Sequence, residues 1–147
     1  MLAHASHVLA TRMTAAFAEI GITPREYCVL QHAAAGELTQ IELARLSDLD
    51  KTTMVVALDD LEDAGYAERR PSRADRRARV VVVTDEGRRL VAAGREIADA
   101  VHAEVLADLP AASRSTFVGS LNRLVSGLLA EPVACERPVR RARQTAG

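Results

Sequence analysis

One change of hydrophobic period constrains the fold of this chain more than any other feature. Apolar residues recur at helical spacing both before Ala67 and after Thr84, which predicts helices on both sides. Between them, Ala67–Arg70 and Arg79–Thr84 favour β-strands, the second because it contains four consecutive valines. The polar segment 71–78 joins the two strands as a long hairpin loop. The sequence therefore predicts a mainly α protein with one β-hairpin.

Capping signals predict where the helices of the middle block begin. Thr23–Glu26 and Thr39–Glu42 both have the Thr-x-x-Glu pattern of a capping box, and each should open a helix. Asp50 can cap a third helix whose core face is Met54, Ala57, Leu58 and Leu61, and Gly65 should end it. These three short helices followed by the hairpin match the order of a winged helix-turn-helix.

Longer amphipathic helices are expected on either side of this block. The first covers about Leu2–Ile20, and another runs from Thr84 to about Leu109, where Pro110 breaks it. The last helix should present one apolar face, made of Phe117, Leu121, Leu124, Val125 and Leu128. Such faces need a partner surface, and a second copy of the chain is the simplest one.

The predicted organisation therefore has four segments. Residues 1–22 form an N-terminal dimerisation helix, and 23–87 form the winged helix-turn-helix. Residues 88–130 form C-terminal dimerisation helices, and 131–147 form a disordered or loosely packed tail.

Charge is distributed unevenly along the chain. The formal net charge is −1, yet Arg69–Arg79 contains six arginines and one aspartate, a local charge of +5. Arginines crowded at a hairpin tip repel one another unless an anionic partner is present, so duplex DNA is the expected partner. We find no signal peptide, membrane span, disulfide pattern or metal-ligand spacing, and we expect a cytoplasmic protein with no cofactor and no membrane partner.

The expected DNA contacts lie on the third short helix, the helix before it and the wing. Thr52 and Thr53 can hydrogen-bond bases or phosphates, Lys51 can reach a phosphate or guanine, and Val55 or Val56 can touch a thymine methyl. An ordinary amphipathic helix with an exposed polar face explains the same pattern equally well. The remaining candidates are the helix start at Thr39 and Gln40, where free amides suit a phosphate, and the wing residues Arg73, Asp75, Arg76 and Arg77.

Several of these segments resemble the multiple-antibiotic-resistance regulator (MarR) family of bacterial transcription factors. The matching motifs are Leu43-Ala44, Leu58–Tyr66, Asp75-Arg76-Arg77 and Val83–Gly87. The resemblance implies a homodimer with interlocked first and last helices that sets two recognition helices in successive major grooves. It also implies that Arg76, supported by Arg73 and Arg77, enters the minor groove, and that a small molecule or an oxidant relieves repression.

The recognition helix departs from the family pattern in two ways. Val55-Val56 replaces a polar Thr-Arg pair, and Asp60 stands where many members carry Arg. With Asp59, Glu62 and Asp63, Asp60 makes the second half of this helix acidic and repulsive to phosphate. Base reading is therefore expected from Lys51 to Val56, with the wing supplying much of the affinity.

The resemblance to the MarR family also implies an effector site between the dimer helices and the DNA-binding block. Met13, Phe17 and Tyr27 are candidates to line a cavity for a small phenolic or other apolar effector, although core packing is the simpler explanation for each of them. Cys28 and His32 are four residues apart on one helix and can approach each other as a reactive thiolate site or as metal ligands. A buried structural cysteine beside a surface histidine is the competing interpretation.

Three functional hypotheses remain from the sequence. The first is a dimeric winged-helix repressor that binds a pseudo-palindromic site. The second is a winged-helix protein-interaction module without sequence-specific DNA binding, in which the acidic cluster Asp59, Asp60, Glu62 and Asp63 docks an arginine-rich or helical partner. The third is a DNA-binding redox sensor that acts through Cys28. Enzyme motifs are absent, so catalysis is not expected.

Overall fold

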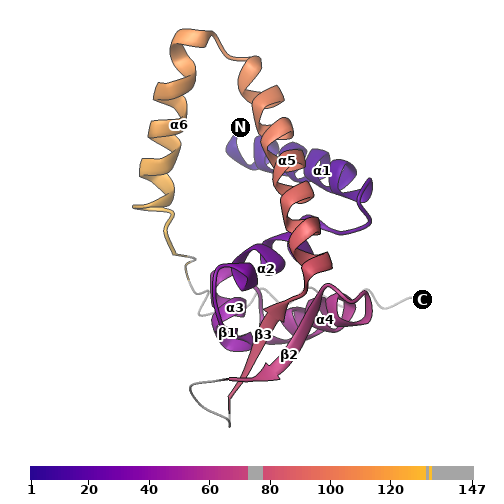
Figure 1. Ribbon diagram of the computed structural model, residues 1–147. Helices are drawn as coiled ribbons and strands as arrows, with labels where there is room; N and C mark the ends of the chain where they lie inside the picture. The colour runs from indigo at the N-terminus through magenta and orange to yellow at the C-terminus, as the bar shows by residue number, and fades with distance from the viewer. Residues whose placement is uncertain (73–77, 132, 134–147) are drawn as a thin grey trace, which may run out of the picture. The chain divides into compact units, whose positions relative to one another are not determined.

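The computed structural model describes residues 1–72, 78–131 and 133. It divides into two compact units, Met1–Val105 and Leu106–Gly147. The elements in chain order are α1 (Leu2–Ala18), α2 (Pro24–Ala34), β1 (Leu38–Thr39), α3 (Gln40–Leu46), α4 (Lys51–Asp63), β2 (Ala67–Pro71), β3 (Arg79–Val83), α5 (Asp85–Ala107) and α6 (Ala111–Val125) (Figure 1). The predicted fold class, mainly α with a β-hairpin wing, is confirmed.

The predicted caps of the middle block are formed. The Thr23 side chain accepts from the Glu26 backbone N–H at 3.1 Å, while the Glu26 carboxylate accepts from the Thr23 backbone N–H at 2.6 Å. Thr39 and Glu42 make the same reciprocal pair at the start of α3. These bonds satisfy backbone donors that have no partner within the helix, so they fix where each helix begins.

The sheet has three antiparallel strands in the order β1-β3-β2. β2 and β3 form the predicted hairpin, with Ala67 opposite Val83 and Pro71 opposite Arg79. β1 was not predicted, because two residues carry no detectable period. It exists through its pairing with β3, in which Leu38 lies opposite Val81.

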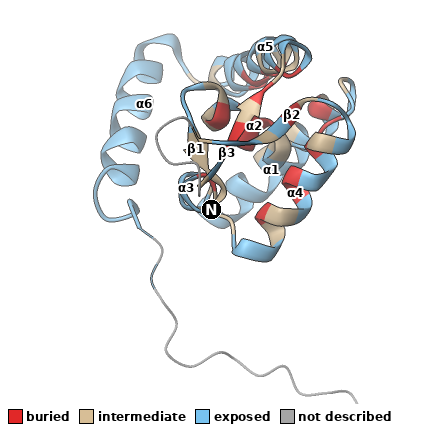
Figure 2. Ribbon diagram, turned by 60° about the horizontal axis from the view of Figure 1, so that its bottom comes forward, coloured by how far each residue is buried: buried red, intermediate tan, exposed pale blue. Residues whose placement is uncertain are grey.

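One hydrophobic core holds the winged block together. The predicted inner face of α4 (Met54, Ala57, Leu58 and Leu61) is buried throughout. Around it pack α2, α3 and the inner faces of β2 and β3, which contribute Val29, Leu30, Ala33, Leu43, Ala67, Val81 and Val83. Figure 2 shows this buried set at the centre of the first unit.

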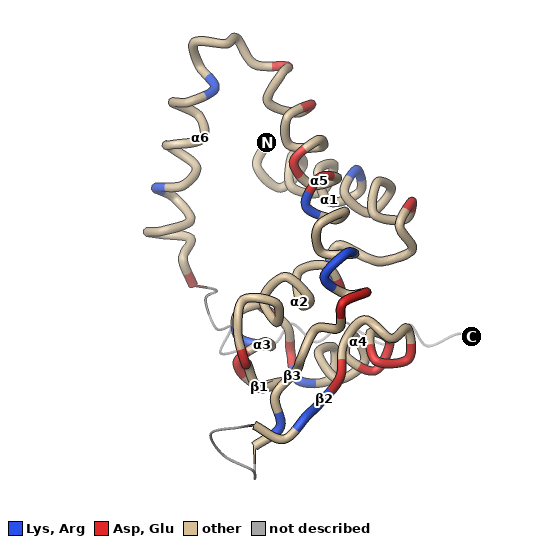
Figure 3. Tube along the Cα trace, viewed as in Figure 1, with Lys and Arg blue, Asp and Glu red and all other residues tan. Residues whose placement is uncertain are grey.

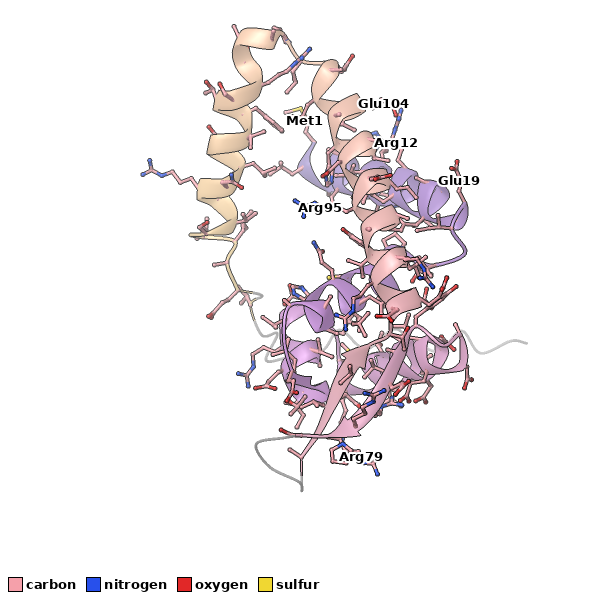
Figure 4. All side chains as sticks on the ribbon, viewed as in Figure 1. Met1, Arg12, Glu19, Arg79, Arg95 and Glu104 are labelled. Carbon is pink, nitrogen blue, oxygen red and sulfur yellow. The ribbon has the colours of Figure 1, made fainter. Side chains whose placement is uncertain are left out.

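A second, smaller core lies where α1 and α2 meet α5. Phe17 is fully buried, and its ring centroid lies 4.8 Å from that of Tyr27. Gly94 of α5 packs against both rings, and a Cβ there would lie only 2.5 Å from the Tyr27 ring. A glycine in the middle of this long helix is therefore explained by close packing. Farther along, Arg12 of α1 and Glu104 of α5 face each other and pair at 2.7 Å (Figure 4).

Thr84 joins the hairpin to α5. Its hydroxyl donates to the Gly65 carbonyl at 2.8 Å and accepts from the Gly87 backbone N–H at 3.0 Å. Its own backbone N–H donates to the Tyr66 carbonyl at 3.1 Å. A Cβ at Gly87 would collide with that same Tyr66 oxygen. Thr84 and Gly87 therefore join three chain segments: the turn after α4, the end of β3 and the start of α5.

The second unit contains α6, none of whose residues is buried. The helix ends at Val125, with Ser126 as its C-cap. The predicted apolar face therefore extends only as far as Val125, and Leu128 lies outside the helix. Within α6, the exposed large apolar side chains are Phe117, Val118, Leu121, Leu124 and Val125. The predicted tail 131–147 lies almost entirely outside the described residues.

Candidate nucleic-acid interface

The first turn of α4 is built around Asp50. The Asp50 carboxylate accepts from the backbone N–H groups of Thr52 at 2.9 Å and Thr53 at 3.0 Å, and from the Thr53 hydroxyl at 2.5 Å. These bonds, the hydroxyl bond foremost, lower the pKa of the Asp50 carboxyl. The Thr53 hydroxyl proton is thereby engaged in the cap, whereas Thr52 is exposed.

The outer face of α4 is exposed as the sequence indicates. Lys51 and Thr52 are exposed at its start, Val55 is half-buried, and Val56 is 54% exposed. Asp59 continues the same face one turn later. Polar and apolar side chains therefore share the surface that a winged helix-turn-helix offers to the major groove.

The acidic half of α4 is partly neutralised by Arg69 of β2. The Arg69 guanidinium lies 2.8 Å from the Asp59 carboxylate and also donates to Glu62. The Arg69 backbone N–H donates to Glu62 at 2.6 Å as well. This corrects two expectations, because Asp59 and Glu62 are not free carboxylates and Arg69 is not part of the outward basic cluster. Figure 3 shows acidic residues of α4 close to basic residues of β2.

The start of α3 is less open to phosphate than expected. The Glu42 carboxylate accepts from the Thr39 backbone N–H and from the Thr39 hydroxyl, both at 2.7 Å. These bonds lower the pKa of Glu42, so a negative charge sits at this helix end. Thr39 and Gln40 are both half-buried. Any phosphate contact here has to be made beside that carboxylate.

The hairpin extends beyond the helical part of its unit. Arg70 pairs with its neighbour Glu68 at 2.6 Å, and exposed Arg79 lies near the distal end of β3 (Figure 4). The predicted wing contacts Arg73, Asp75, Arg76 and Arg77 lie outside the described residues.

This arrangement has well-matched relatives. A family model described as the MarR family matches residues 20–78. The MarR family protein Rv2887 of Mycobacterium tuberculosis, solved in complex with p-aminosalicylic acid, is 30% identical, with a TM-score of 0.71. That match covers 84% of this chain and 94% of Rv2887. The chain belongs to the MarR family.

Two further relatives agree with this assignment. CouR from Rhodococcus jostii, solved bound to p-coumaroyl-CoA, is 27% identical with a TM-score of 0.78 and covers 92% of each chain. Transcriptional regulator HosA of Escherichia coli O157:H7 is 29% identical over 106 residues, which are 71% of this chain and 78% of HosA. This MarR-family chain is therefore a transcriptional regulator and not an enzyme.

The residues expected to line an effector cavity have different environments in this MarR-family chain. The structure assigns Phe17 and Tyr27 to the second core, where their rings pack together rather than around a cavity. The pKa of the Tyr27 hydroxyl is raised, mainly because the side chain is buried. Met13, Cys28 and His32 are half-buried.

The environment of Cys28 favours a protonated thiol. Burial raises its pKa, nearby Asp48 raises it further, and only the Ser47 hydroxyl acts in the other direction. A reactive cysteine requires a lowered pKa, so this environment supports the structural interpretation. Within the described ranges, no group of three or more His, Cys, Asp or Glu side chains is placed to hold a metal ion.

A cavity that sequence reasoning missed lies between the end of α2 and the hairpin. Its volume is about 250 Å³, and its lining includes Ala33, Glu37, Arg70, Val82 and Arg88. None of the five predicted effector residues lines it.

Finally, no helix in the part of the chain that the structure describes is long and apolar enough to cross a membrane.

Proposed function

We propose that this MarR-family regulator is a homodimeric, cytoplasmic repressor that binds a pseudo-palindromic DNA site and is released by a small-molecule effector. The observation that carries the proposal is the exposed outer face at the start of α4, a helix whose second half is tied by Arg69 to strand β2 of the hairpin. The chain also belongs to a family of transcriptional regulators. In such folds the start of the recognition helix meets base edges while the wing follows the adjacent groove.

The proposed contacts divide into two kinds. Lys51, Thr52, Val55 and Val56 read bases or reach the nearest phosphates from α4, and Thr53 supports them through the cap. The remaining contacts position the protein on the duplex and come from Thr39, Gln40, Arg73, Arg76 and Arg77, with Asp75 stiffening the wing loop. Arginine suits this task because its guanidinium binds phosphate and enters narrow minor grooves.

The dimer proposal is supported by apolar surface that the single chain leaves uncovered. Phe117, Leu121 and Leu124 are each more than 40% exposed on α6. Leu2 and Val8 of α1 are exposed as well. A face of this kind marks an interaction surface, and a two-fold dimer is the commonest way to cover one. A dimer also presents two copies of α4, which a pseudo-palindromic site matches.

The effector we propose is a small phenolic or other apolar molecule. The support is that Rv2887 was solved with p-aminosalicylic acid and, in a second structure, with salicylic acid. In this chain the half-buried side chains of Met13, Cys28 and His32 keep surface that a ligand can reach. Phe17 and Tyr27 would support the site from the core.

The decisive experiment selects bound duplexes from a random library and then measures their affinity as salt is raised. We expect one recurring two-fold sequence whose affinity falls steeply with salt, because phosphate contacts release counterions. Arg76→Ala should weaken binding about tenfold or more through loss of a groove contact. Arg95→Ala, at an exposed arginine in the middle of α5, serves as the matched control and should bind normally.

Recovery of no sequence above random, with Arg76→Ala indistinguishable from the unmodified protein, would overturn the proposal. Repression is tested with a reporter gene placed behind the selected site. Transcription should fall when the protein is present and recover when salicylate is added. A protein that raises transcription would contradict the repressor assignment alone.

The protein-interaction alternative has lost part of its support. It depends on an acidic cluster free to bind an arginine-rich partner, yet Arg69 of the same chain already pairs with two of the four carboxylates.

A further inference from the structure

One apolar side chain stands out on the DNA-facing surface of α4. Met54, Ala57, Leu58 and Leu61 of this helix are buried, whereas Val56 is 54% exposed. Helical periodicity sets Val56 in line with exposed Thr52 four residues before it. An isolated exposed valine needs no explanation on most surfaces. On a recognition helix, however, an exposed valine can contact an apolar group of a DNA base.

The major groove offers one apolar group to such a side chain. Thymine carries a C5-methyl there, whereas the other base edges present hydrogen-bond donors and acceptors. Valine has two methyl groups and no polar atom, so its favourable contact with a base edge is with that methyl. The same C5-methyl occurs on 5-methylcytosine, and the experiment has to distinguish the two sources.

The neighbours of Val56 limit other ways of reading a base at this level. The described residues of α4 include no asparagine, glutamine or arginine. Asp59, one turn farther on, accepts from the Arg69 guanidinium at 2.8 Å, so its charge is partly neutralised. That pairing also reduces the repulsion that would keep this turn away from DNA.

We propose that Val56 is a specificity-determining residue that reads the C5-methyl of thymine in the major groove of each half-site. The proposal rests on the proposed function, since it requires α4 to enter the groove. It predicts that the selected site contains a thymine whose methyl group contributes to affinity.

The test removes the methyl group from the DNA and from the protein separately. Each thymine of the duplex selected by the unmodified protein is replaced, one at a time, by deoxyuridine, which lacks only the C5-methyl. We expect one position in each half-site at which affinity falls about fourfold, the effect of one buried methyl group. The Val56→Ala variant should bind more weakly and should show no further loss at that position.

Thr52→Ala is the matched control on the same helix face. It should lower affinity but keep the deoxyuridine penalty, because it leaves the Val56 methyl groups in place. Replacing the critical thymine by cytosine and then by 5-methylcytosine separates the two sources. Recovery with 5-methylcytosine shows that the methyl alone is read, and a further shortfall measures the combined contribution of the thymine O4 and the paired adenine.

Two results overturn the inference. One is an unchanged affinity at every deoxyuridine position, and the other is a Val56→Ala variant that keeps the full penalty. Thermal unfolding of the variant checks that this exposed substitution leaves the fold intact. Failure to select any sequence would instead overturn the proposed function, so the two failures are distinguishable.

Discussion

The guanidinium of Arg69 lies 2.8 Å from the carboxylate of Asp59, which ties strand β2 to the outer face of helix α4. Glu62 shares the same guanidinium. The side chain of Arg69 is only 22% exposed, so its two ion pairs are better protected from solvent than the others described in the chain. It fixes the base of the hairpin against the helix proposed to read DNA.

Replacing Arg69 should therefore affect both stability and DNA binding. Arg69→Met should lower the free energy of unfolding by about 1 kcal/mol, a value that allows for partial exposure. It should also weaken DNA binding, because two carboxylates on α4 become unpaired. Urea denaturation and a binding titration measure the two effects. Arg70→Met is the control for stability, since Arg70 and Glu68 are both about half exposed and should contribute little.

Gly94 should not tolerate a side chain. Gly94→Ala should lower the free energy of unfolding by about 1–3 kcal/mol, because the new methyl overlaps the Tyr27 ring in a packed core. Gly119→Ala is the matched control in α6, where a Cβ has no neighbour within 4 Å. That change should be neutral or stabilising by up to about 1 kcal/mol. Equal effects of the two substitutions in urea denaturation would contradict the packing role of Gly94.

The Thr84 hydroxyl should matter more than its methyl group. Thr84→Ala removes a donor to Gly65 and an acceptor for Gly87, and should lower the free energy of unfolding by about 1–2 kcal/mol. Thr84→Ser keeps the hydroxyl and should recover most of that loss. Chemical denaturation of both variants distinguishes the hydrogen bonds from simple packing, which predicts similar losses for alanine and serine.

Acid should destabilise the starts of α3 and α4. Hydrogen bonds hold the pKa of Asp50 and of Glu42 below their ordinary values of 3.8 and 4.5. The stabilisation they provide is complete above those values and is lost as pH falls through the lower pKa of the folded state. Urea midpoints measured between about pH 6 and pH 3 should therefore decline. The Asp50→Asn, Glu42→Gln double variant keeps oxygen acceptors and should decline less, and an equal decline would count against this explanation.

Charge introduced on α6 should prevent self-association. Leu121→Glu together with Leu124→Glu inserts two carboxylates into the exposed apolar face, where burial in a dimer would be costly. Sedimentation analysis should find a dimer for the unmodified protein and a monomer for the variant. Arg123→Glu reverses a charge on the opposite, exposed face of the same helix and should remain dimeric. A dimer that persists in the leucine variant would place the interface elsewhere.

The features that sequence reasoning predicted well depend on short-range chemistry. The caps at Thr23, Thr39 and Asp50 join residues two or three positions apart, so the sequence contains both partners. The buried face of α4 follows from helical spacing in the same way. The density of arginines likewise identified the hairpin as the basic segment of the chain. It could not show that Arg69 pairs with carboxylates of α4.

The features that were missed depend on tertiary approach. β1 forms only by pairing with β3. Arg69 can bond Glu62 because the turn at Gly65 brings β2 back alongside α4. For Phe17 and Tyr27 the sequence left a cavity role and a core role as alternatives, because nothing in it shows that Gly94 allows α5 to close over them. Local pattern cannot separate an aromatic that lines a pocket from one that fills the core.

A single residue, Thr84, separates the end of β3 from the start of α5. Three hydrogen bonds hold that residue to Gly65, Tyr66 and Gly87, so the connection is short and fixed in position. We expect a tilt of the first turn of α5 to move the end of β3 with it, because no flexible linker separates the two elements. We therefore expect a ligand that shifts the start of α5 to move strands β2 and β3 as well, without contacting them.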